Sequence, residues 1–265
     1  MKDMLFAQVK SKFEKLKSIK KANFVEKIRL NGKTVGLFET ETGKYYLPLD
    51  ANNDIIANTI IRGKIYDESI FNCAKQFIKP NTAVLDVGAN FGQMTVLFSK
   101  MLNGTGKVYA FEAGEFVFSI LEKNVELNNC KNVKTVFGAV ADKDDEIHFY
   151  PEIDFKRFQT YGSYRLSPND SSGHPVKSLK IDSLNIPEKI SFMKIDIQGY
   201  DLLAMKGAVE TIKRNKMPIV FEFEYLFQDE LNINFQEYVD FVLSIGYRFE
   251  RVIDRQNYLI LPKKS

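Results

Sequence analysis

Residues 84–92 read V-L-D-V-G-A-N-F-G. The apolar run, interrupted only by Asp86, is typical of a buried parallel strand. Gly88 and Gly92 then predict a tight turn, and residues 93–101 have the apolar periodicity of a helix. A strand, turn and helix in this order present backbone N–H groups at a helix N-terminus, where an anionic group can bind. This stretch therefore predicts a ligand site at the end of a parallel strand.

A second strand is predicted at residues 107–111, and it is followed directly by Glu112. A carboxylate at the tip of the second strand is the arrangement that holds both hydroxyls of an adenosine ribose. The turn reads D-x-G-x-x-x-G and not the G-x-G-x-x-G that a dinucleotide pyrophosphate requires. A looser turn with Asn90 suits S-adenosylmethionine, whose ammonium would face Asp86 and whose carboxylate would face the turn amides. The alternative is a strand, turn and helix without ligand, but two unpaired buried carboxylates would then be costly.

The composition limits the classes of protein to consider. A chain of 265 residues suits one large α/β domain with an appendage, or two small domains. A formal net charge of +3 gives no reason to expect nucleic-acid binding, which needs a clustered basic face. Cys73 and Cys130 lack metal-ligand spacing and predict reduced thiols in a cytoplasmic protein, and the Lys, Asn, Ile and Phe content suggests a bacterial source. No stretch reaches the ~20 apolar residues that span a bilayer.

The first 60 residues predict an extension to the main domain at 61–265. Apolar residues between Leu5 and Ile19 recur at helical spacing among lysines, which predicts a basic amphipathic helix. Such a helix can contact an anionic membrane or a partner, although packing against its own domain is the commoner arrangement. Residues 24–49 alternate in short runs broken by turn signals, which predicts β-hairpins.

Strands and helices then alternate along the chain, which predicts an α/β fold with a doubly wound, mostly parallel, seven-stranded sheet. The small residues Gly138 and Ala139 would let a flat adenine lie against the backbone. Residues 142–178 interrupt the alternation with Asp, Ser, Pro and Gly, and we expect an irregular lid over the substrate there. The remaining predicted elements are helices at 60–77, 116–128, 202–213 and 235–245, strands at 133–137, 190–196 and 218–223, and a terminal hairpin at 247–253 and 257–261 on the sheet edge.

Two further strands end in carboxylates at the same predicted edge of the sheet. The fourth strand ends at Asp196, and the fifth reads F-E-F-E with Glu222 and Glu224. Ligands of open α/β sheets bind at this edge, so these carboxylates are candidates for Mg²⁺ or another divalent cation that orients a substrate hydroxyl. In the alternative interpretation Asp196 caps the next helix and the glutamates pair with Lys or Arg.

The chain has two histidines. His148 lies in a strand-like stretch and is expected to be structural. His174 lies in the polar segment, where an imidazole could accept the proton of a substrate hydroxyl near neutral pH. Most single loop histidines are exposed and inactive, however. The sequence therefore leaves two candidate general bases, His174 and Asp196.

Several motifs together resemble the FkbM family of S-adenosylmethionine-dependent methyltransferases. They are D-V-G-A-N-F-G-Q-M-T, A-F-E-A, N-V-E-L-N, G-A-V-A, K-I-D-I-Q-G-Y-D and K-G-A, and they span residues 60–225. The resemblance implies a Rossmann-like methyltransferase fold and a substrate-side or metal role for Asp196. Two positions depart from the family pattern: Ala113 replaces a usual Pro, and Gln198 replaces a common Glu. The candidate cofactor-binding residues are Asp86, Gly88, Ala89, Asn90, Gly92, Thr95, Glu112 and Ala139.

These observations predict an O-methyltransferase that acts on a hydroxyl of a small acceptor. Because family members modify sugars, polyketides and related metabolites, the resemblance implies a sugar acceptor, such as a nucleotide sugar or a precursor of capsule or lipopolysaccharide. An oxidoreductase would need a third glycine in the turn, and a nucleic-acid methyltransferase would need a basic face beyond the N-terminal helix. A non-catalytic module that binds the cofactor is a further alternative, because Gln198 departs from the pattern.

Overall fold

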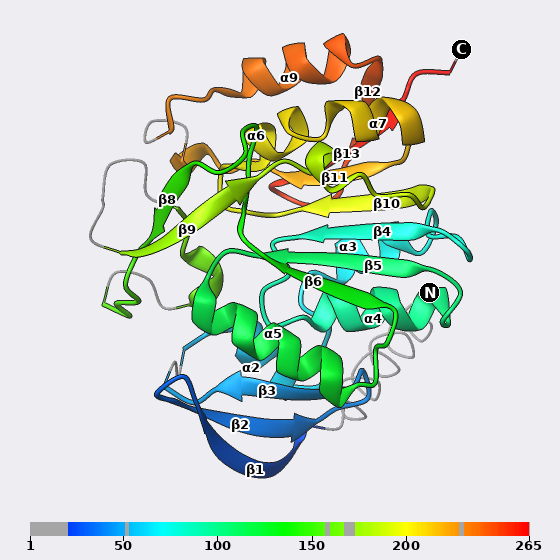
Figure 1. Ribbon diagram of the computed structural model, residues 1–265. Coiled ribbons are helices and arrows are strands. Elements are labelled where there is room, and N and C mark those ends of the chain that lie inside the picture. Colours follow the sequence, from blue (N-terminus) through cyan, green and yellow to red (C-terminus); the bar gives the residue numbers. More distant parts are fainter. Residues whose placement is uncertain (1–20, 51–52, 157–159, 167–172, 228–230, 265) are drawn as a thin grey trace, which may run out of the picture.

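A seven-stranded sheet forms the centre of the protein (Figure 1). The computed structural model describes residues 21–50, 53–156, 160–166, 173–227 and 231–264. The predicted basic helix therefore lies outside the described residues. The strand order is β12-β13-β11-β10-β4-β5-β6, which confirms the predicted sheet. Its strands are β4 (Ala83–Val87), β5 (Lys107–Glu112), β6 (Val133–Phe137), β10 (Ile190–Ile195), β11 (Ile219–Glu222), β12 (Tyr247–Val252) and β13 (Asn257–Pro262).

The terminal hairpin enters the sheet differently from the prediction. Only β13 runs antiparallel, and it lies between β11 and β12, so β12 is the edge strand. After β11 the chain forms a helix and then the outermost strand, β12. The last strand, β13, then pairs with both β11 and β12 and fills the space between them. The apolar residues Leu259 and Ile260 explain this inner position, because both are almost fully buried. An edge strand would leave one side of its backbone unpaired.

Helices cover both faces of the central sheet, as alternate residues of β4 show. Val84 packs with Phe98 and other apolar side chains of the α3 and α4 face. Leu85 and Val87 belong to the core on the opposite face. One face carries α3 (Glu68–Ala74), α4 (Gln93–Leu102) and α5 (Glu115–Leu127), and the other carries α6 (Asp201–Lys206), α7 (Val209–Asn215) and α9 (Phe235–Ser244).

The β-hairpins predicted near the N-terminus form a separate three-stranded antiparallel sheet. Helix α5 lies between this sheet and the central one (Figure 1). Asn124 of α5 accepts a hydrogen bond from Tyr46 N at 2.7 Å and donates to Tyr46 O and Phe91 O. Asn128, one turn later, pairs in the same way with Lys44 N and O. The strands are β1 (Asn23–Leu30), β2 (Lys33–Glu39) and β3 (Lys44–Pro48).

The range 60–77 is not one helix as predicted: it contains the last two residues of α2 (Ile55–Ile61), a turn and all of α3. Helix α2 begins at the N-cap Asp54, whose carboxylate accepts from Ala57 N at 2.7 Å. Gly63, with φ of +73°, turns the chain away after α2. The apolar pattern of this region comes from two helices in succession, which is why it resembled one.

The segment at 142–178 contains more regular structure than predicted. It includes β8 (Ile147–Tyr150) and most of β9 (His174–Leu179), which pair antiparallel, and β9 also pairs with β7 (Ala139–Val140). The segment was predicted to be irregular because the many turn residues between these short strands interrupt the alternation of apolar and polar residues. Three 3-10 turns complete the described elements: η1 (Tyr161–Ser163), η2 (Asp182–Leu184) and η3 (Tyr225–Phe227). Within the described part of the chain, every helix is too short or too polar to cross a bilayer.

Candidate functional site

A cavity of about 540 Å³ lies at the carboxyl ends of the parallel strands. This is the edge at which open α/β sheets bind ligands, and the volume lies in the usual range for ligand sites. The cavity is lined by the turn after β4, the ends of β5, β10 and β11, and the β12–β13 turn. Residues 160–166, a segment that we call the strap, also line the cavity.

The turn after β4 is built on a glycine that approaches its neighbour closely. Gly88 has φ of +80°, and a Cβ there would lie 1.9 Å from the backbone carbonyl oxygen of Asp196. Asn90 also has positive φ, at +49°, in the left-handed region that Asn tolerates better than most residues. These two residues bring the turn against the end of β10 and place it on the cavity wall.

The amides of this turn have partners within the protein. The N–H groups of Gly88 and Ala89 both donate to Phe111 O, at 3.0 and 2.9 Å. The amide of Asn90 donates to the Glu112 carboxylate at 3.0 Å, and Gly92 N donates to Ala89 O. The expectation that these amides face a ligand carboxylate is therefore not met by the observed hydrogen bonds.

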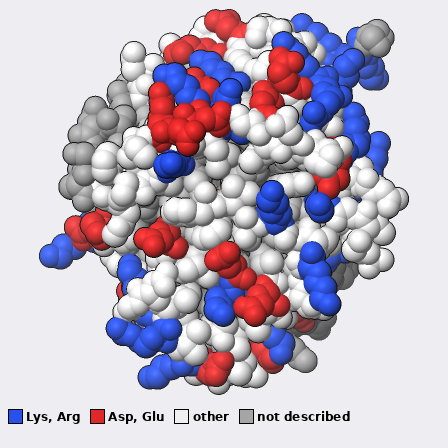
Figure 2. Space-filling view, viewed as in Figure 1, with Lys and Arg blue, Asp and Glu red and all other residues white. Residues whose placement is uncertain are grey.

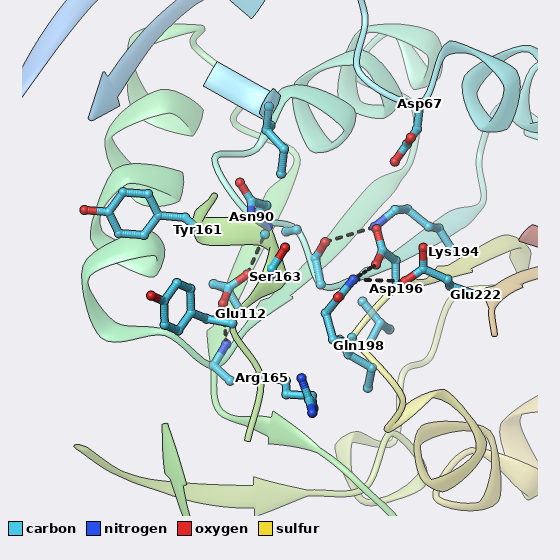
Figure 3. Close-up of a pocket in the computed structure, with 18 of the residues that line it drawn as sticks. Asp67, Asn90, Glu112, Tyr161, Ser163, Arg165, Lys194, Asp196, Gln198 and Glu222 are labelled. Carbon is cyan, nitrogen blue, oxygen red and sulfur yellow. Dashed lines mark hydrogen bonds and ion pairs between the residues drawn. The ribbon is translucent and has the colours of Figure 1, made fainter. Parts of the chain in front are cut away.

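Glu112 lies where the sequence places it, at the end of β5 on the cavity wall. Its carboxylate accepts three backbone hydrogen bonds, from Asn90, Ala113 and Gly114, at 2.9–3.0 Å. Burial raises the pKa of Glu112 above its ordinary value, and the three amide donors oppose that shift. The three bonds hold the carboxylate beside the turn after β4, next to Asn90 in Figure 3. Gly138 and Ala139 line the same part of the cavity.

Asp86 and Thr95 lie behind the cavity. Both side chains are fully buried, and neither residue is among those that line the cavity. Thr95 Oγ1 donates to Asp86 Oδ2 at 2.6 Å. Burial raises the pKa of Asp86, and the nearby ammonium of Lys194 opposes that shift. The structure therefore does not bring these two side chains to the expected cofactor contact, and it gives Asp86 a protein partner instead.

Lys194 is a buried residue of the site that the sequence interpretation missed. It lies opposite Asp86 in the register of β10 and β4, with only 5% of its side chain exposed. Its Nζ lies 2.9 Å from Gly88 O, 3.6 Å from Asp86 Oδ1 and 3.5 Å from Asp196 Oδ2. Burial lowers the pKa of Lys194, but the carboxylates of Asp196 and Asp86 outweigh burial and raise it above its ordinary value. A lysine within a strand of buried apolar residues was the available signal, because such a lysine needs an acidic partner.

At the ends of β10 and β11, an amide links Asp196 to Glu222. Gln198 Nε2 donates to Asp196 Oδ1 at 3.2 Å and to Glu222 Oε2 at 2.9 Å. Burial, together with the neighbouring carboxylate of Asp196, raises the pKa of Glu222 strongly. Figure 3 shows these side chains converging from the ends of β10 and β11. Gln198 therefore does part of what the sequence interpretation assigned to a cation, since it holds two acidic side chains together.

The predicted metal site is not supported by this donor set. Among the described residues, no group of three or more His, Cys, Asp or Glu side chains is arranged to hold a metal ion. Asp196 and Glu222 are bridged by the Gln198 amide, and the ammonium of Lys194 lies beside Asp196. Glu224 lines the cavity, and burial raises its pKa.

The strap lies within the segment 142–178 that was predicted as a substrate lid, but its individual residues were not predicted as part of the site. Asp54 Oδ2 accepts hydrogen bonds from Thr160 Oγ1 at 2.9 Å and from Tyr161 N at 2.7 Å. The ring of Tyr161 packs edge-on against Phe91 of the turn after β4. Asp67, which precedes α3, also lines the cavity, and burial with nearby Asp196 raises its pKa. Asp54, Asp67 and the strap residues belong to no motif that marks a binding site.

His174 does not lie in the site. It begins β9, its side chain is 56% exposed, and its Nε2 lies 2.9 Å from Glu152 Oε1. The described residues that line the cavity do not include it. The predicted polar loop is a paired strand at this point, which directs the imidazole away from the cavity.

Known proteins resemble the chain as follows. The structure of methyltransferase FkbM from Methylobacillus flagellatus KT has 15% identity and a TM-score of 0.45 over 77% of this chain and 52% of that one, so this chain spans about half its length. Trm5b from Pyrococcus abyssi has 14% identity and a TM-score of 0.47 over 91% of this chain and 62% of its own. TYW2 of M. jannaschii, solved with AdoMet, has 14% identity and a TM-score of 0.42 over 91% of each chain. No curated protein matches the chain significantly.

The match to a family model is more extensive. The model described as the methyltransferase FkbM domain matches residues 86–249, which is more than half of the 265 residues. The matched region runs from Asp86 in β4 through the strap and the Asp196–Gln198–Glu222 group to β12, and so includes most of the cavity wall. The chain belongs to the FkbM family of methyltransferases.

Proposed function

We propose that the protein transfers a methyl group from S-adenosylmethionine to a hydroxyl oxygen of a small acceptor, with a sugar as the acceptor class. The observation that carries this proposal is a single cavity with a rigid carboxylate, Glu112, at one end and the Asp196–Gln198–Glu222 group at the other. The family membership supports methyl transfer, and the resemblance to sugar-modifying members supports the acceptor class.

The cofactor end suits an adenosine. Glu112 presents a carboxylate at the tip of β5, where the two ribose hydroxyls of an adenosine are held in related sheets. Gly88 leaves no side chain between the turn and the end of β10, and Ala139 adds only a methyl group on the adjoining wall. Glu112, Gly88, Ala89, Asn90 and Ala139 would therefore hold the cofactor. When bound, it supplies an electrophilic methyl group on a sulfonium.

At the acceptor end, Asp196 is the candidate general base. Its side chain is about 20% exposed and lines the cavity, so it can reach a ligand. Asp196 would take the proton of the acceptor hydroxyl as the methyl group is transferred and would later release it to water. Gln198 orients the carboxylate by donating to Oδ1. Holding the acceptor hydroxyl and the methyl group in near-attack geometry can lower the barrier by roughly 7–11 kcal/mol.

The proposal also includes a cytoplasmic location and a small acceptor in place of a nucleic acid. Cys73 and Cys130 are both buried free thiols, as expected in a reducing compartment such as the cytoplasm. Lys and Arg are interspersed with Asp and Glu on the face in Figure 2, with no basic area of the kind that tracks a nucleic-acid backbone. The charge pattern of this face therefore gives no support to a nucleic-acid acceptor, in keeping with the small acceptor that we propose.

The test is a turnover assay that measures S-adenosylhomocysteine formed with a panel of neutral sugars and nucleotide sugars. We expect Asp196→Asn to lower kcat by roughly 10²–10⁴, as is typical of general-base loss. Asp240→Asn, an exposed change on α9 that removes only a contact with Gln236, is the control and should leave kcat unchanged. Full activity of Asp196→Asn would remove Asp196 from this role, and absence of turnover across the panel would count against a sugar acceptor.

A further inference from the structure

Lys194 connects the two ends of the cavity. We propose that Lys194 is a positioning residue that binds both the turn after β4 and the acceptor-side carboxylate of Asp196. It thereby fixes the position of the Asp196 carboxylate relative to the cofactor end of the cavity. This inference rests on the proposed function, because it assigns Asp196 to the acceptor. It concerns a residue that touches neither reacting atom and acts through Asp196 and Gly88.

The first argument is the match between donors and acceptors. A lysine ammonium has three N–H donors and no acceptor. Three oxygens face Nζ: the carbonyl of Gly88 at 2.9 Å, Asp196 Oδ2 at 3.5 Å and Asp86 Oδ1 at 3.6 Å. One belongs to the turn after β4, one to the end of β10, and one to β4 itself, the strand that pairs with β10. The ammonium therefore lies close to an oxygen of the turn, an oxygen of Asp196 and an oxygen of Asp86.

The second argument is the backbone contact at the same point. Asp196 N donates to Val87 O at 3.0 Å, and Gly88 lies directly against the carbonyl of Asp196. The backbones of the two ends are therefore already in contact. The Asp196 side chain still rotates about its own bonds, and Lys194 on one side with Gln198 on the other restrains it. A misplacement of about 1 Å in such a site lowers turnover by about 10²-fold.

The alternative is that Lys194 only neutralises Asp86. Asp86 Oδ2 is already bonded to Thr95, and within the described residues Asp86 Oδ1 has no hydrogen-bond partner although Lys194 lies at 3.6 Å. The shorter contact of Nζ is with Gly88 O, and Lys194 lines the cavity whereas Asp86 does not. The contact with Gly88 O and the position of Lys194 on the cavity wall both favour a role for Lys194 in positioning the site. The raised pKa of Lys194 keeps it charged and excludes it as the proton acceptor.

Double-mutant cycles separate the two interpretations. We would compare Lys194→Met, Asp196→Asn and Asp86→Asn, alone and combined, measuring kcat, KM, melting temperature and the Kd of S-adenosylhomocysteine by calorimetry. Lys194→Met should lower kcat by about 10²-fold with KM and Kd changed by less than about 3-fold. In the Asp196→Asn background it should lower kcat no further. Lys189→Met, an exposed change at the far end of β10, is the control for losing a lysine.

Two results would overturn the inference. Recovery of both kcat and melting temperature in Lys194→Met with Asp86→Asn would show that Lys194 serves only as a charge partner. An undiminished effect of Lys194→Met in the Asp196→Asn background would show that it does not act through Asp196.

Hydrogen exchange gives a readout that needs no acceptor. S-adenosylhomocysteine should slow exchange both at the turn of residues 88–92 and at residues 195–200 in the wild type, and in Lys194→Met only at the turn. Equal protection of both segments in Lys194→Met would contradict the proposed coupling. Absence of S-adenosylhomocysteine binding to the wild type would instead refute the proposed function, so the two failures are distinguishable.

Discussion

Gly88 lies against Asp196 so closely that a Cβ at Gly88 would stand 1.9 Å from the Asp196 carbonyl oxygen. One residue belongs to the turn after β4 and the other to the end of β10, so the contact joins the predicted cofactor end of the cavity to its acceptor end. Backbone atoms cannot move apart here without breaking the β4–β10 pairing. The glycine is therefore required by tertiary packing in addition to its positive φ.

Gly88→Ala should destabilise the protein more than an equivalent change elsewhere. Gly104 has nearly the same φ, +75° against +80°, but nothing lies within 4 Å of a Cβ built there. Gly104→Ala should therefore cost only the left-handed penalty of about 1 kcal/mol in the free energy of unfolding. Gly88→Ala carries the same penalty and a backbone clash. Denaturant unfolding of the two variants measures the difference, and equal losses would contradict the observed contact.

Asn124→Ala should loosen the attachment of the N-terminal sheet. Its fully buried side chain makes three hydrogen bonds, to both backbone groups of Tyr46 and to Phe91 O. We expect a loss of about 2–4 kcal/mol in the free energy of unfolding, since each buried bond contributes about 1 kcal/mol and its former partners stay desolvated.

Asn128→Ala is the matched control for Asn124→Ala. It removes similar contacts to Lys44, but at a half-buried position where water can replace them. We expect a loss of about 1 kcal/mol or less. A loss for Asn128→Ala as large as that for Asn124→Ala, measured by the same unfolding experiment, would show that burial does not determine the difference.

Asp201 should make stability depend on pH. Burial and the neighbouring carboxylate of Asp196 raise its pKa from 3.8 to about 7, while the backbone N–H of Glu222 opposes the shift by donating to Oδ1. Between about pH 4 and pH 7 the folded protein thus holds a proton that the unfolded chain has released, so the free energy of unfolding falls as pH rises. Asp201→Asn should reduce this slope. An identical slope in urea unfolding across that range would disprove the assignment.

His174→Ala should have little effect on turnover. The side chain is exposed, contacts Glu152 and lies outside the described cavity wall. Loss of a general base lowers turnover by roughly 10²–10⁴, whereas removal of an exposed ion pair should change kcat by less than about 2-fold. Steady-state kinetics of the variant provide the measurement, and a drop of 10² or more would return His174 to the mechanism.

The parts of the fold that follow local pattern were predictable. The strand that ends at Val87, the left-handed turn at Gly88 and the carboxylate at Glu112 follow from apolar runs and glycine spacing, because these signals are local. The stretch around His148 was recognised as strand-like and forms β8, whereas the strand at 174–179 was missed because the Pro and Gly around it resemble a loop. The inner position of β13 depends on long-range pairing, which no local pattern shows.

The site was harder to predict than the fold because its contacts cross between strands. Lys194 meets Asp86 only through the register of β10 and β4, and Gln198 meets Glu222 only across two strand ends. Asp86 was expected to face the cofactor, but the side chains of β4 alternate, so this position faces α4 and Thr95. The sequence therefore predicted a cation between Asp196 and Glu222, where the structure has the Gln198 amide and the Lys194 ammonium beside Asp196.

The central claim is that the cavity binds S-adenosylmethionine through Glu112, and calorimetric titration tests it most directly. S-adenosylmethionine and S-adenosylhomocysteine should bind the wild type with micromolar Kd, and NAD⁺ should not bind. Glu112→Ala should abolish binding, while Glu122→Ala, an exposed change on α5 that removes a contact with Thr135, should leave it intact. Thermal melting confirms that each variant is folded. Binding of NAD⁺ alone, or unchanged binding by a folded Glu112→Ala, would contradict the account.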